Sequence, residues 1–216
     1  MELLNHINTF MQKTDINYAI CGGHAIDMFL GVKTRPHKDI DVSIFQEDRD
    51  SIISHMLNKG WDIYEPYGTE YLHKITNIEN QKRVKLNIWC VKSENPHYIF
   101  TEHEDNTYDV YFDNSEQNEL DYIEFLFNIH KDGYFLYSKN HSIKMKLNEA
   151  ILNDNNIPFL APEIVLLYKS TAIDNADYQL DFENATIKMN DRQLKWLKDS
   201  LMIMFPDGHK WLEGKI

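Results

Sequence analysis

The sequence predicts an α+β protein, with a body of strands and helices to about residue 156 and a helical C-terminal part. Two observations lead to this prediction. Residues 61–147 contain short apolar runs separated by loops rich in Asn, Asp and Glu, which is typical of strands. After residue 156, apolar residues recur at helical spacing. We therefore expect two domains, residues 1–156 and residues 157–216.

Composition limits the function classes. The 216 residues are 43% hydrophobic, enough for a sizeable core, and carry a formal net charge of −12. The acidic excess argues against a nucleic-acid partner, which requires a positive surface, and is compatible with a cationic one. Cys21 and Cys90 lie in apolar runs, so we expect buried thiols. Because residues 1–13 lack the apolar core of a signal peptide and no apolar run approaches the ~18 residues of a membrane span, we expect a cytoplasmic protein without membrane contact.

Helices and strands alternate in residues 1–60. Apolar residues at helical spacing indicate the helices, Gly31 and Gly60 follow two of them as stop signals, and "DIDVSIF" alternates polar and apolar residues as a strand does. The expected elements are a helix in residues 1–13, a strand in 17–23, a helix in 24–31, a strand in 39–45 and a helix in 47–60.

The remaining elements follow from similar signals. In the C-terminal part, Pro162 suits the first position of a helix. Asn190 and Gln193 form the pattern of a capping box, and Pro206 ends the helix that they begin. The strands expected between residues 61 and 147 are "WDIYEPY", "EYLHKIT", "RVKLNIWCV", "YDVYF", "GYFLYS" and "HSIKMKL".

Asp39 and Asp41 are candidate metal ligands. Two carboxylates at this spacing on a strand share one face, roughly 7 Å apart along the chain, and each disfavours the ionised form of the other. A divalent cation removes that cost, and Mg²⁺ is typically held by one or two carboxylates together with phosphates. A strand with acids on its solvated face is the alternative interpretation of this pair.

Gly22 and Gly23 are candidate phosphate contacts. They end a strand and begin a helix whose N–H groups favour an anion, and they lack side chains that would keep a phosphate away. A simple turn is the alternative interpretation. Arg35, His37 and Lys38 precede the aspartates and add positive charge that could act on a triphosphate.

Together these motifs, in "GGHAIDMFLGVKTRPHKDIDVSIF" (residues 22–45), resemble the signature of the nucleotidyltransferase superfamily. The stretch is most similar to aminoglycoside-2''-adenylyltransferases and lincosamide nucleotidyltransferases. These have Gly-Gly, a short helix containing Asp, Leu-Gly, and then Thr-Arg-x-His-x-Asp-(Ile/Leu)-Asp. The runs "PFLAPEIVLLYKS", "DFENA" and "WLKDSLMIMFPDGHKWL" resemble the helical tail of that group. The resemblance implies a polymerase-beta-like mixed β-sheet flanked by helices, with a helical C-terminal part.

The resemblance also implies an activity: transfer of a nucleoside monophosphate from an NTP, expected to be ATP, to a hydroxyl of a small molecule, with release of pyrophosphate. Gly22 and Gly23 would hold the β,γ-phosphates, and Asp39 and Asp41 would bind Mg²⁺. The implied acceptor is antibiotic-like, an aminoglycoside or a lincosamide. Lys169 matches a lysine of the family tail and either reaches the nucleotide or lies at the surface.

One position departs from the family pattern. The family supplies a third acid from a later strand, as a metal ligand or as the general base. Its pattern there is Leu-Asp-(Val/Ile), whereas the run "RVKLNIWCV" of this chain has Leu-Asn-Ile, with Asn87 in place of the acid. An amide oxygen can ligate a metal but cannot take a proton at neutral pH. The acids that could substitute for it are Asp62, Glu70 and Glu94.

Three hypotheses follow. The first is a Mg²⁺-dependent nucleotidyltransferase acting on a small hydroxylated molecule, with Asp39, Asp41 and Asn87 at the catalytic positions. The second is a catalytically impaired, nucleotide-binding relative in which Asn87 marks the lost chemistry. The third is a nucleotidyltransferase whose acceptor is a protein or a tRNA, of which the net charge disfavours the RNA. The intact glycine and aspartate motifs favour the first hypothesis.

Overall fold

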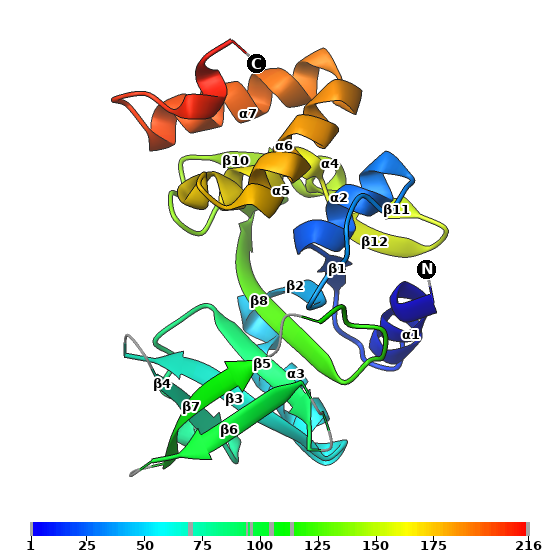
Figure 1. Cartoon of the computed structure of the whole chain (residues 1–216), viewed down its shortest axis with the longest axis vertical. Coiled ribbons are helices and arrows are strands. Elements are labelled where there is room, and N and C mark those ends of the chain that lie inside the picture. The colour runs from blue at the N-terminus through cyan, green and yellow to red at the C-terminus, as the bar shows by residue number, and fades with distance from the viewer. Residues whose placement is uncertain are drawn as a thin grey trace. The chain divides into compact units, whose positions relative to one another are not determined.

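The computed structural model describes residues 2–68, 71–93, 95, 97–103, 106–112 and 115–214. The chain forms two compact units, each assembled from two stretches of sequence (Figure 1). The first unit comprises Met1–Tyr18 and Pro36–Asn128, and the second comprises Ala19–Arg35 and Ile129–Ile216. Neither unit has a boundary at residue 156. The expected division into domains 1–156 and 157–216 therefore stays a prediction.

The first unit is a mixed β-sheet with two helices, α1 (Glu2–Met11) and α3 (Arg49–Asn58). Its strands lie in the order β2-β8-β5-β3-β4-β7-β6, with β2 and β8 parallel and all other neighbours antiparallel. These strands are β2 (Asp41–Phe45), β3 (Trp61–Tyr67), β4 (Tyr71–Ile75), β5 (Asn87–Lys92), β6 (Tyr98–Glu102), β7 (Thr107–Phe112) and the first part of β8 (Tyr122–Lys131). Short 3-10 turns occupy Gln46–Asp48 and Ile78–Asn80.

Apolar side chains of both helices fill the core of the first unit. α3 packs against β3 and buries Ile53 and Met56 completely. In α1, Ile7 is fully buried, and the Phe10 ring lies 6.1 Å from the Trp61 ring at the start of β3. Because side chains alternate along a strand, Trp61 faces the helices and the neighbouring residues Asp62 and Tyr64 face the other side of the sheet.

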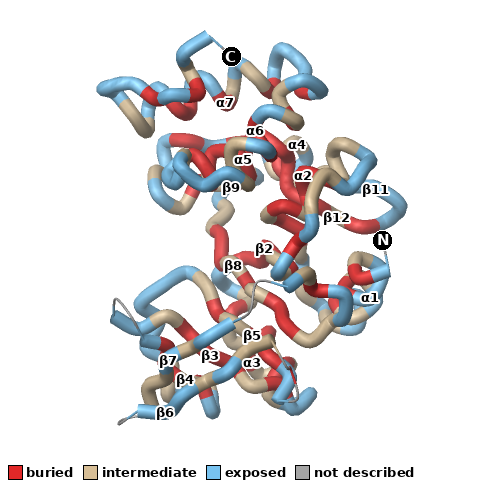
Figure 2. The backbone as a smooth tube through the Cα atoms, in the orientation of Figure 1, coloured by how far each residue is buried: buried red, intermediate tan, exposed pale blue. Residues whose placement is uncertain are grey.

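Strand β2 is mostly buried (Figure 2): Asp41 is half-buried and the four residues after it are buried. The strand begins at Asp41, and Asp39 lies in the segment before it. Val42 and Ile44 are buried, and so is Ser43, whose hydroxyl accepts a hydrogen bond of 2.8 Å from the Asn128 side chain. The polar Ser43 is therefore satisfied inside the protein instead of by water.

The second unit combines short strands with five α-helices among its described residues. Helix α2 comes before β8 in the sequence, and α4, α5, α6 and α7 come after it. β12 pairs with β11 antiparallel and with β1 parallel, while β9 lies between the end of β8 and β10. Helix α5 is almost entirely buried and packs against α2, α6 and α7. No helix among the described residues has both the length and the apolarity needed to cross a membrane. The elements are β1 (Tyr18–Ile20), α2 (Gly22–Leu30), β9 (Tyr134–Leu136), β10 (Lys144–Lys146), α4 (Leu147–Ala150), β11 (Ile151–Asp154), β12 (Ile157–Leu160), α5 (Pro162–Lys169), α6 (Ala176–Lys188) and α7 (Asp191–Met204), with 3-10 turns at Ser170–Ala172 and Lys210–Leu212.

Three helix boundaries expected from the sequence are confirmed. Gly31 ends α2 with a φ of 75°, in the left-handed region that glycine adopts without steric cost. Pro162 stands in the first turn of α5. Asn190 and Gln193 exchange two hydrogen bonds of 3.1 Å at the start of α7, which is the expected capping box.

The structure adds β6, β8, β11, β12, α4 and α6 to the expected elements. Strand β8 is an apolar run without regular alternation, a pattern that a centrally placed strand shows because neither face needs to be polar. β11 and β12 are joined by Asn155 and Asn156, which have φ values of 50° and 64°. Two successive left-handed residues form a type I′ hairpin turn, so Asn-Asn was the local signal for this hairpin.

A buried carboxylate on β3 fixes the segment that leads into β5. Glu65 is fully buried and accepts hydrogen bonds from Arg49 Nη2 (2.9 Å) and from the backbone N–H of Arg83 (2.9 Å) and Lys82. His73 Nδ1 lies 3.3 Å from the other carboxylate oxygen. Helix α3, β3, β4 and the segment before β5 therefore meet at one carboxylate.

We expect Glu65→Gln to destabilise the protein by about 3–5 kcal/mol, because it leaves the buried guanidinium of Arg49 without its counter-charge. The control is Asp199→Asn, which breaks the exposed ion pair with Lys195 and should cost less than about 1 kcal/mol. Urea unfolding of both variants measures the difference. Equal losses would show that Glu65 is not the stabilising centre of this segment.

Candidate metal centre

Asp39 and Asp41 are positioned by the buried start of β2. Ile40 and Val42, which alternate with the two aspartates, are completely buried. The Ile40 carbonyl accepts a hydrogen bond of 3.0 Å from the Glu124 N–H, which ties this segment to β8. Burial of the apolar neighbours fixes the backbone, and the two carboxylates consequently project from a rigid segment.

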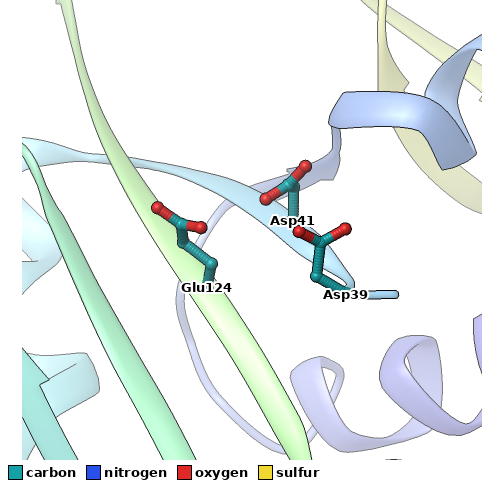
Figure 3. Close-up of side chains that lie close together, drawn as sticks. All are labelled: Asp39, Asp41 and Glu124. Atoms are coloured by element: carbon teal, nitrogen blue, oxygen red, sulfur yellow. The ribbon is translucent and has the colours of Figure 1, made fainter. Parts of the chain in front are cut away.

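A third carboxylate joins them from β8. Glu124 is the register partner of Asp41 in the parallel β2–β8 pair. Carboxylate oxygens of Asp39, Asp41 and Glu124 all lie within 4.8 Å of one another (Figure 3). Among the described residues, no other group of three His, Cys, Asp or Glu side chains meets this spacing. We call these three residues the carboxylate triad.

The triad has the chemistry of a site for a hard divalent cation. It offers oxygen ligands only, which Mg²⁺ and similar ions prefer over the nitrogen and sulfur ligands that select zinc. Without a cation, three acids this close would repel one another and favour protonation of at least one of them. The donor set therefore fits a Mg²⁺ ion held by the protein together with further oxygen ligands.

Glu124 shows this electrostatic cost. Its side chain is half-buried, and burial together with the charge of Asp39 raises the pKa of its carboxyl from the usual 4.5 to about 7. The Asn87 amide opposes the shift by donating a hydrogen bond of 2.7 Å to Glu124 Oε1. A pKa near neutrality suits a group that has to take and release a proton.

Asn87 lies beside the third carboxylate. It begins β5, adjacent to β8, and its amide holds the Glu124 side chain in place. The expectation that an acid is missing from the metal centre because residue 87 is Asn therefore needs correction, since β8 supplies the acid. Among the substitutes considered, Asp62 forms an ion pair of 2.8 Å with Lys74 on the neighbouring strand, whereas Glu70 and Glu94 lie outside the described residues.

Sequence reasoning missed Glu124 because its pairing partner Asp41 is far away along the chain. In its own stretch, "YIEFLFNIH", the many aromatic and aliphatic residues indicate core. The available signal was that Glu124 is the single acid within this apolar run. A charged residue in such a run is rarely buried without a partner or a function.

His37 and Lys38 belong to the same unit as the triad, directly before Asp39. The His37 side chain is buried, and its carbonyl accepts a hydrogen bond of 2.8 Å from the Gln117 N–H. The Lys38 side chain is exposed. Their expected action on a triphosphate stays a prediction.

Gly22 and Gly23 belong to the second unit, where they are the first two residues of α2. Gly22 has a φ of 63°, a left-handed conformation that other residues adopt only with strain. The positive φ is therefore a structural reason for glycine at position 22, independent of any ligand. The expected contact with phosphate stays a prediction.

Arg35 and Lys169, also in the second unit, share one carboxylate. Asp181 is fully buried and accepts hydrogen bonds from Arg35 Nε (3.2 Å) and Nη2 (3.1 Å). Lys169 Nζ lies 3.0 Å from the same carboxylate and 4.1 Å from the centre of the Tyr178 ring. Lys169 is thus buried, which contradicts the alternative of a surface lysine. Asp177 lies 3.4 Å from Arg35 Nη1, so two carboxylates face the two cations.

The raised pKa of Glu124 predicts a dependence of stability on pH when no divalent ion is present. The folded state retains the proton up to about pH 7, whereas the unfolded state releases it near 4.5, so ionisation of this group destabilises the fold as the pH rises between these values. Glu124→Gln should therefore raise stability at about pH 8, by at most about 3 kcal/mol, and leave it unchanged at about pH 4.5.

Urea unfolding in EDTA at the two pH values measures this effect, with Glu79→Gln, an exposed acid of the same unit, as the control. If Glu124→Gln gained the same stability at both pH values, the ionised Glu124 carboxylate would not be the cause of the gain, which would contradict this prediction.

Comparisons with known proteins agree with the resemblance of the motifs. The sequence profile of the aminoglycoside-2''-adenylyltransferase family matches residues 3–82. No curated protein matches the chain in sequence. The solution structure of the antibiotic-resistance factor ANT(2'')-Ia is similar with a TM-score of 0.50 at 12% identity, covering 94% of this chain and 92% of that one.

Two crystal structures are also similar. The lincosamide antibiotic adenylyltransferase LnuA, with lincomycin bound, has a TM-score of 0.45 at 16% identity, covering 83% of this chain and 94% of its own. ANT(2'')-Ia in complex with adenylyl-2''-tobramycin has a TM-score of 0.47 at 11% identity, covering 94% and 99%. The expected fold class and resemblance are confirmed: the chain has a mixed β-sheet flanked by helices, and it resembles the nucleotidyltransferases of the aminoglycoside-2''-adenylyltransferase type.

Proposed function

We propose that the protein transfers a nucleoside monophosphate from an NTP, with ATP as the first candidate, to a hydroxyl of a small molecule and releases pyrophosphate. The single observation that carries this proposal is the carboxylate triad, Asp39, Asp41 and Glu124, within 4.8 Å on two paired segments of one sheet. The similarity of residues 3–82 to aminoglycoside-2''-adenylyltransferases supports the same reaction class.

Each member of the triad has a role in this reaction. Asp39 and Asp41 would hold Mg²⁺, which when bound neutralises charge on the phosphates and on the attacking and leaving oxygens. Glu124 takes the proton of the attacking hydroxyl, since its pKa of about 7 lets it act as a base near neutrality. The hydroxyl oxygen then forms a bond to the α-phosphorus while the bond to the pyrophosphate oxygen breaks. Asn87 keeps the Glu124 carboxylate oriented.

The residues proposed for the nucleotide are those that offer positive charge or free backbone N–H groups. Gly22 and Gly23 open a helix whose first N–H groups favour an anion, and Arg35 and Lys169 are the cations of the same unit that we propose for a phosphate group. The remaining basic residues proposed for the triphosphate are His37 and Lys38.

The acceptor that we propose is an antibiotic-like small molecule, an aminoglycoside or a lincosamide. The net charge of −12 favours a cationic acceptor and disfavours tRNA. A protein acceptor finds no specific support in the site. The hypothesis of a catalytically impaired relative depended on the absence of a third acid at position 87. Glu124 can take that place, so we do not favour this hypothesis. We also propose a cytoplasmic location, which the two buried thiols Cys21 and Cys90 support.

Pyrophosphate release with Mg²⁺, each of the four NTPs and a panel of aminoglycosides and lincosamides tests the proposal. We expect release that depends on the acceptor. Asp41→Asn should reduce it at least about 10²-fold through loss of a metal ligand, and Glu124→Gln by about 10²–10⁴-fold through loss of the base.

The matched control is Asp109→Asn, an exposed aspartate of the same unit that pairs with His103, and it should retain full activity. Activity in Asp41→Asn equal to that of the control would contradict the proposed role of the triad.

A further inference from the structure

Three helices of the second unit bring a set of charged side chains together. Helices α2, α5 and α6 pack against one another. Arg35 follows α2, Lys169 is the last residue of α5, and Asp177 and Asp181 stand on α6. The two aspartates are four residues apart, so they lie on the same face of α6, one turn from each other. We call these four residues the charge cluster.

One aspartate of the charge cluster is buried and firmly bound. The Asp181 carboxylate is fully buried and accepts hydrogen bonds from Arg35 Nε (3.2 Å) and Nη2 (3.1 Å). Lys169 Nζ lies 3.0 Å from the same carboxylate and is held 4.1 Å above the Tyr178 ring. Because a buried charge that loses its partner is costly, these contacts form the permanent part of the cluster.

The other aspartate is exposed and loosely bound. The Asp177 side chain is 51% exposed, and its Oδ2 lies 3.4 Å from Arg35 Nη1, while the Arg35 side chain is 13% exposed. An exposed ion pair contributes little to stability, because water and salt screen it. An anion that binds arginine more strongly can therefore replace Asp177. Phosphate is such an anion, since its oxygens form strong charge-assisted hydrogen bonds with a guanidinium group.

The segment that carries Arg35 is fixed from the side of α2. Asp27 is 8% exposed and accepts hydrogen bonds from the Thr34 N–H (2.9 Å) and the Thr34 hydroxyl (2.7 Å). Burial lowers the pKa of Arg35, but the hydrogen bond to Asp181 and the charges of the three aspartates around it outweigh burial and raise the pKa. Arg35 is therefore a positioned and permanently charged group, whichever anion faces its Nη1.

We propose that Asp177 competes with the nucleotide: it pairs with Arg35 while no nucleotide is bound, and a phosphate group of the nucleotide takes its place. The charge cluster holds two cations and two carboxylates, so it attracts a phosphate only when one carboxylate gives way. Asp177 is the carboxylate that can give way at low cost. This inference rests on the proposed function, in which Arg35 and Lys169 serve a phosphate group, and adds the residue that limits binding there.

Asp177 also has a local role in its helix. It lies in the first turn of α6, where its N–H donates a hydrogen bond of 2.9 Å to the Asn175 side chain. An acid at this place interacts favourably with the helix dipole, which would explain an aspartate here without any ligand. The experiment must therefore separate an effect on folding from an effect on phosphate binding.

The test is calorimetric titration of α,β-methylene-ATP with Mg²⁺ into the full chain at low ionic strength. Asp177→Asn removes the competing charge and should lower the Kd of the analogue about two- to fivefold. Asp177→Glu restores a carboxylate at this position and should bind the analogue with the wild-type Kd. Arg35→Gln should raise the Kd at least about tenfold, because a charged donor to the phosphate is lost.

Two comparisons make this test specific. Asp174→Asn is the matched control, because it removes the same charge from an exposed aspartate just before α6, and it should keep the wild-type Kd. Asp177→Asn combined with Arg35→Gln should bind the analogue like Arg35→Gln alone, since the gain requires the guanidinium group. Urea unfolding of every variant is measured alongside.

An unchanged Kd in Asp177→Asn would overturn the inference, and a lower urea midpoint in that variant would then mean that Asp177 serves only the helix. An equal gain in Asp174→Asn would also overturn it, because the cause would be the net charge of the protein. So would a gain that persists in the Arg35→Gln background, and so would failure of the wild type to bind the analogue.

Pyrophosphate release by the wild-type protein is scored separately. A wild type that binds the analogue, gains affinity through Asp177→Asn and releases no pyrophosphate keeps this inference and contradicts the proposed function. A wild type that releases pyrophosphate, while Asp177→Asn leaves the Kd unchanged, keeps the proposed function and contradicts this inference.

Discussion

Mutual repulsion among three carboxylates within 4.8 Å is the constraint around which the first unit is built. Such a cluster is stable in one geometry only if the backbone that bears it cannot move apart. The parallel pairing of β2 with β8, with Asp41 opposite Glu124, supplies that rigidity. Ile40 and Val42, which alternate with the two aspartates, are fully buried and anchor this segment in the core. A cation turns this electrostatic cost into binding energy, because the protein has already brought the ligands together.

The supporting structure extends two strands away from the triad. Glu65 collects hydrogen bonds from Arg49 and from the backbone just before β5, and β5 begins at Asn87. Asn87 in turn holds the Glu124 side chain at 2.7 Å. A buried ion pair is weak evidence for net stability, but it fixes one arrangement of the elements that meet at it. In this protein that arrangement determines where β5 starts and where the third carboxylate points.

The sequence predicted the parts of the site that are local and missed the part that is not. Asp39 and Asp41 are two residues apart, so their spacing was sufficient to predict that they lie together. The helix boundaries at Gly31 and Asn190 also depend on local conformations and hydrogen bonds. Glu124, by contrast, reaches Asp41 only through long-range strand pairing, which no local pattern encodes.

The motif comparison placed the third acid on the strand of Asn87, whereas the acid of the triad lies on the neighbouring strand β8. Asn87 stands where the family's pattern has an acid, and the structure gives it a supporting role on the neighbouring strand instead. The same limit applies to Trp89, which becomes the register neighbour of Glu124 only through the pairing of β5 with β8. Composition indicated only that aromatic residues and acids are abundant, whereas the strand register places Asp41, Glu124 and Trp89 next to one another.

The most direct test of the central claim is a titration of Mn²⁺ followed by electron paramagnetic resonance, with Mn²⁺ in place of Mg²⁺. It is carried out with a non-hydrolysable ATP analogue on the wild type and on a double variant, Asp39→Asn with Asp41→Asn. The account predicts a bound Mn²⁺ signal in the wild type that is lost in the double variant, while the variant remains folded. Equal Mn²⁺ binding by both proteins would show that the carboxylate triad is not the metal centre.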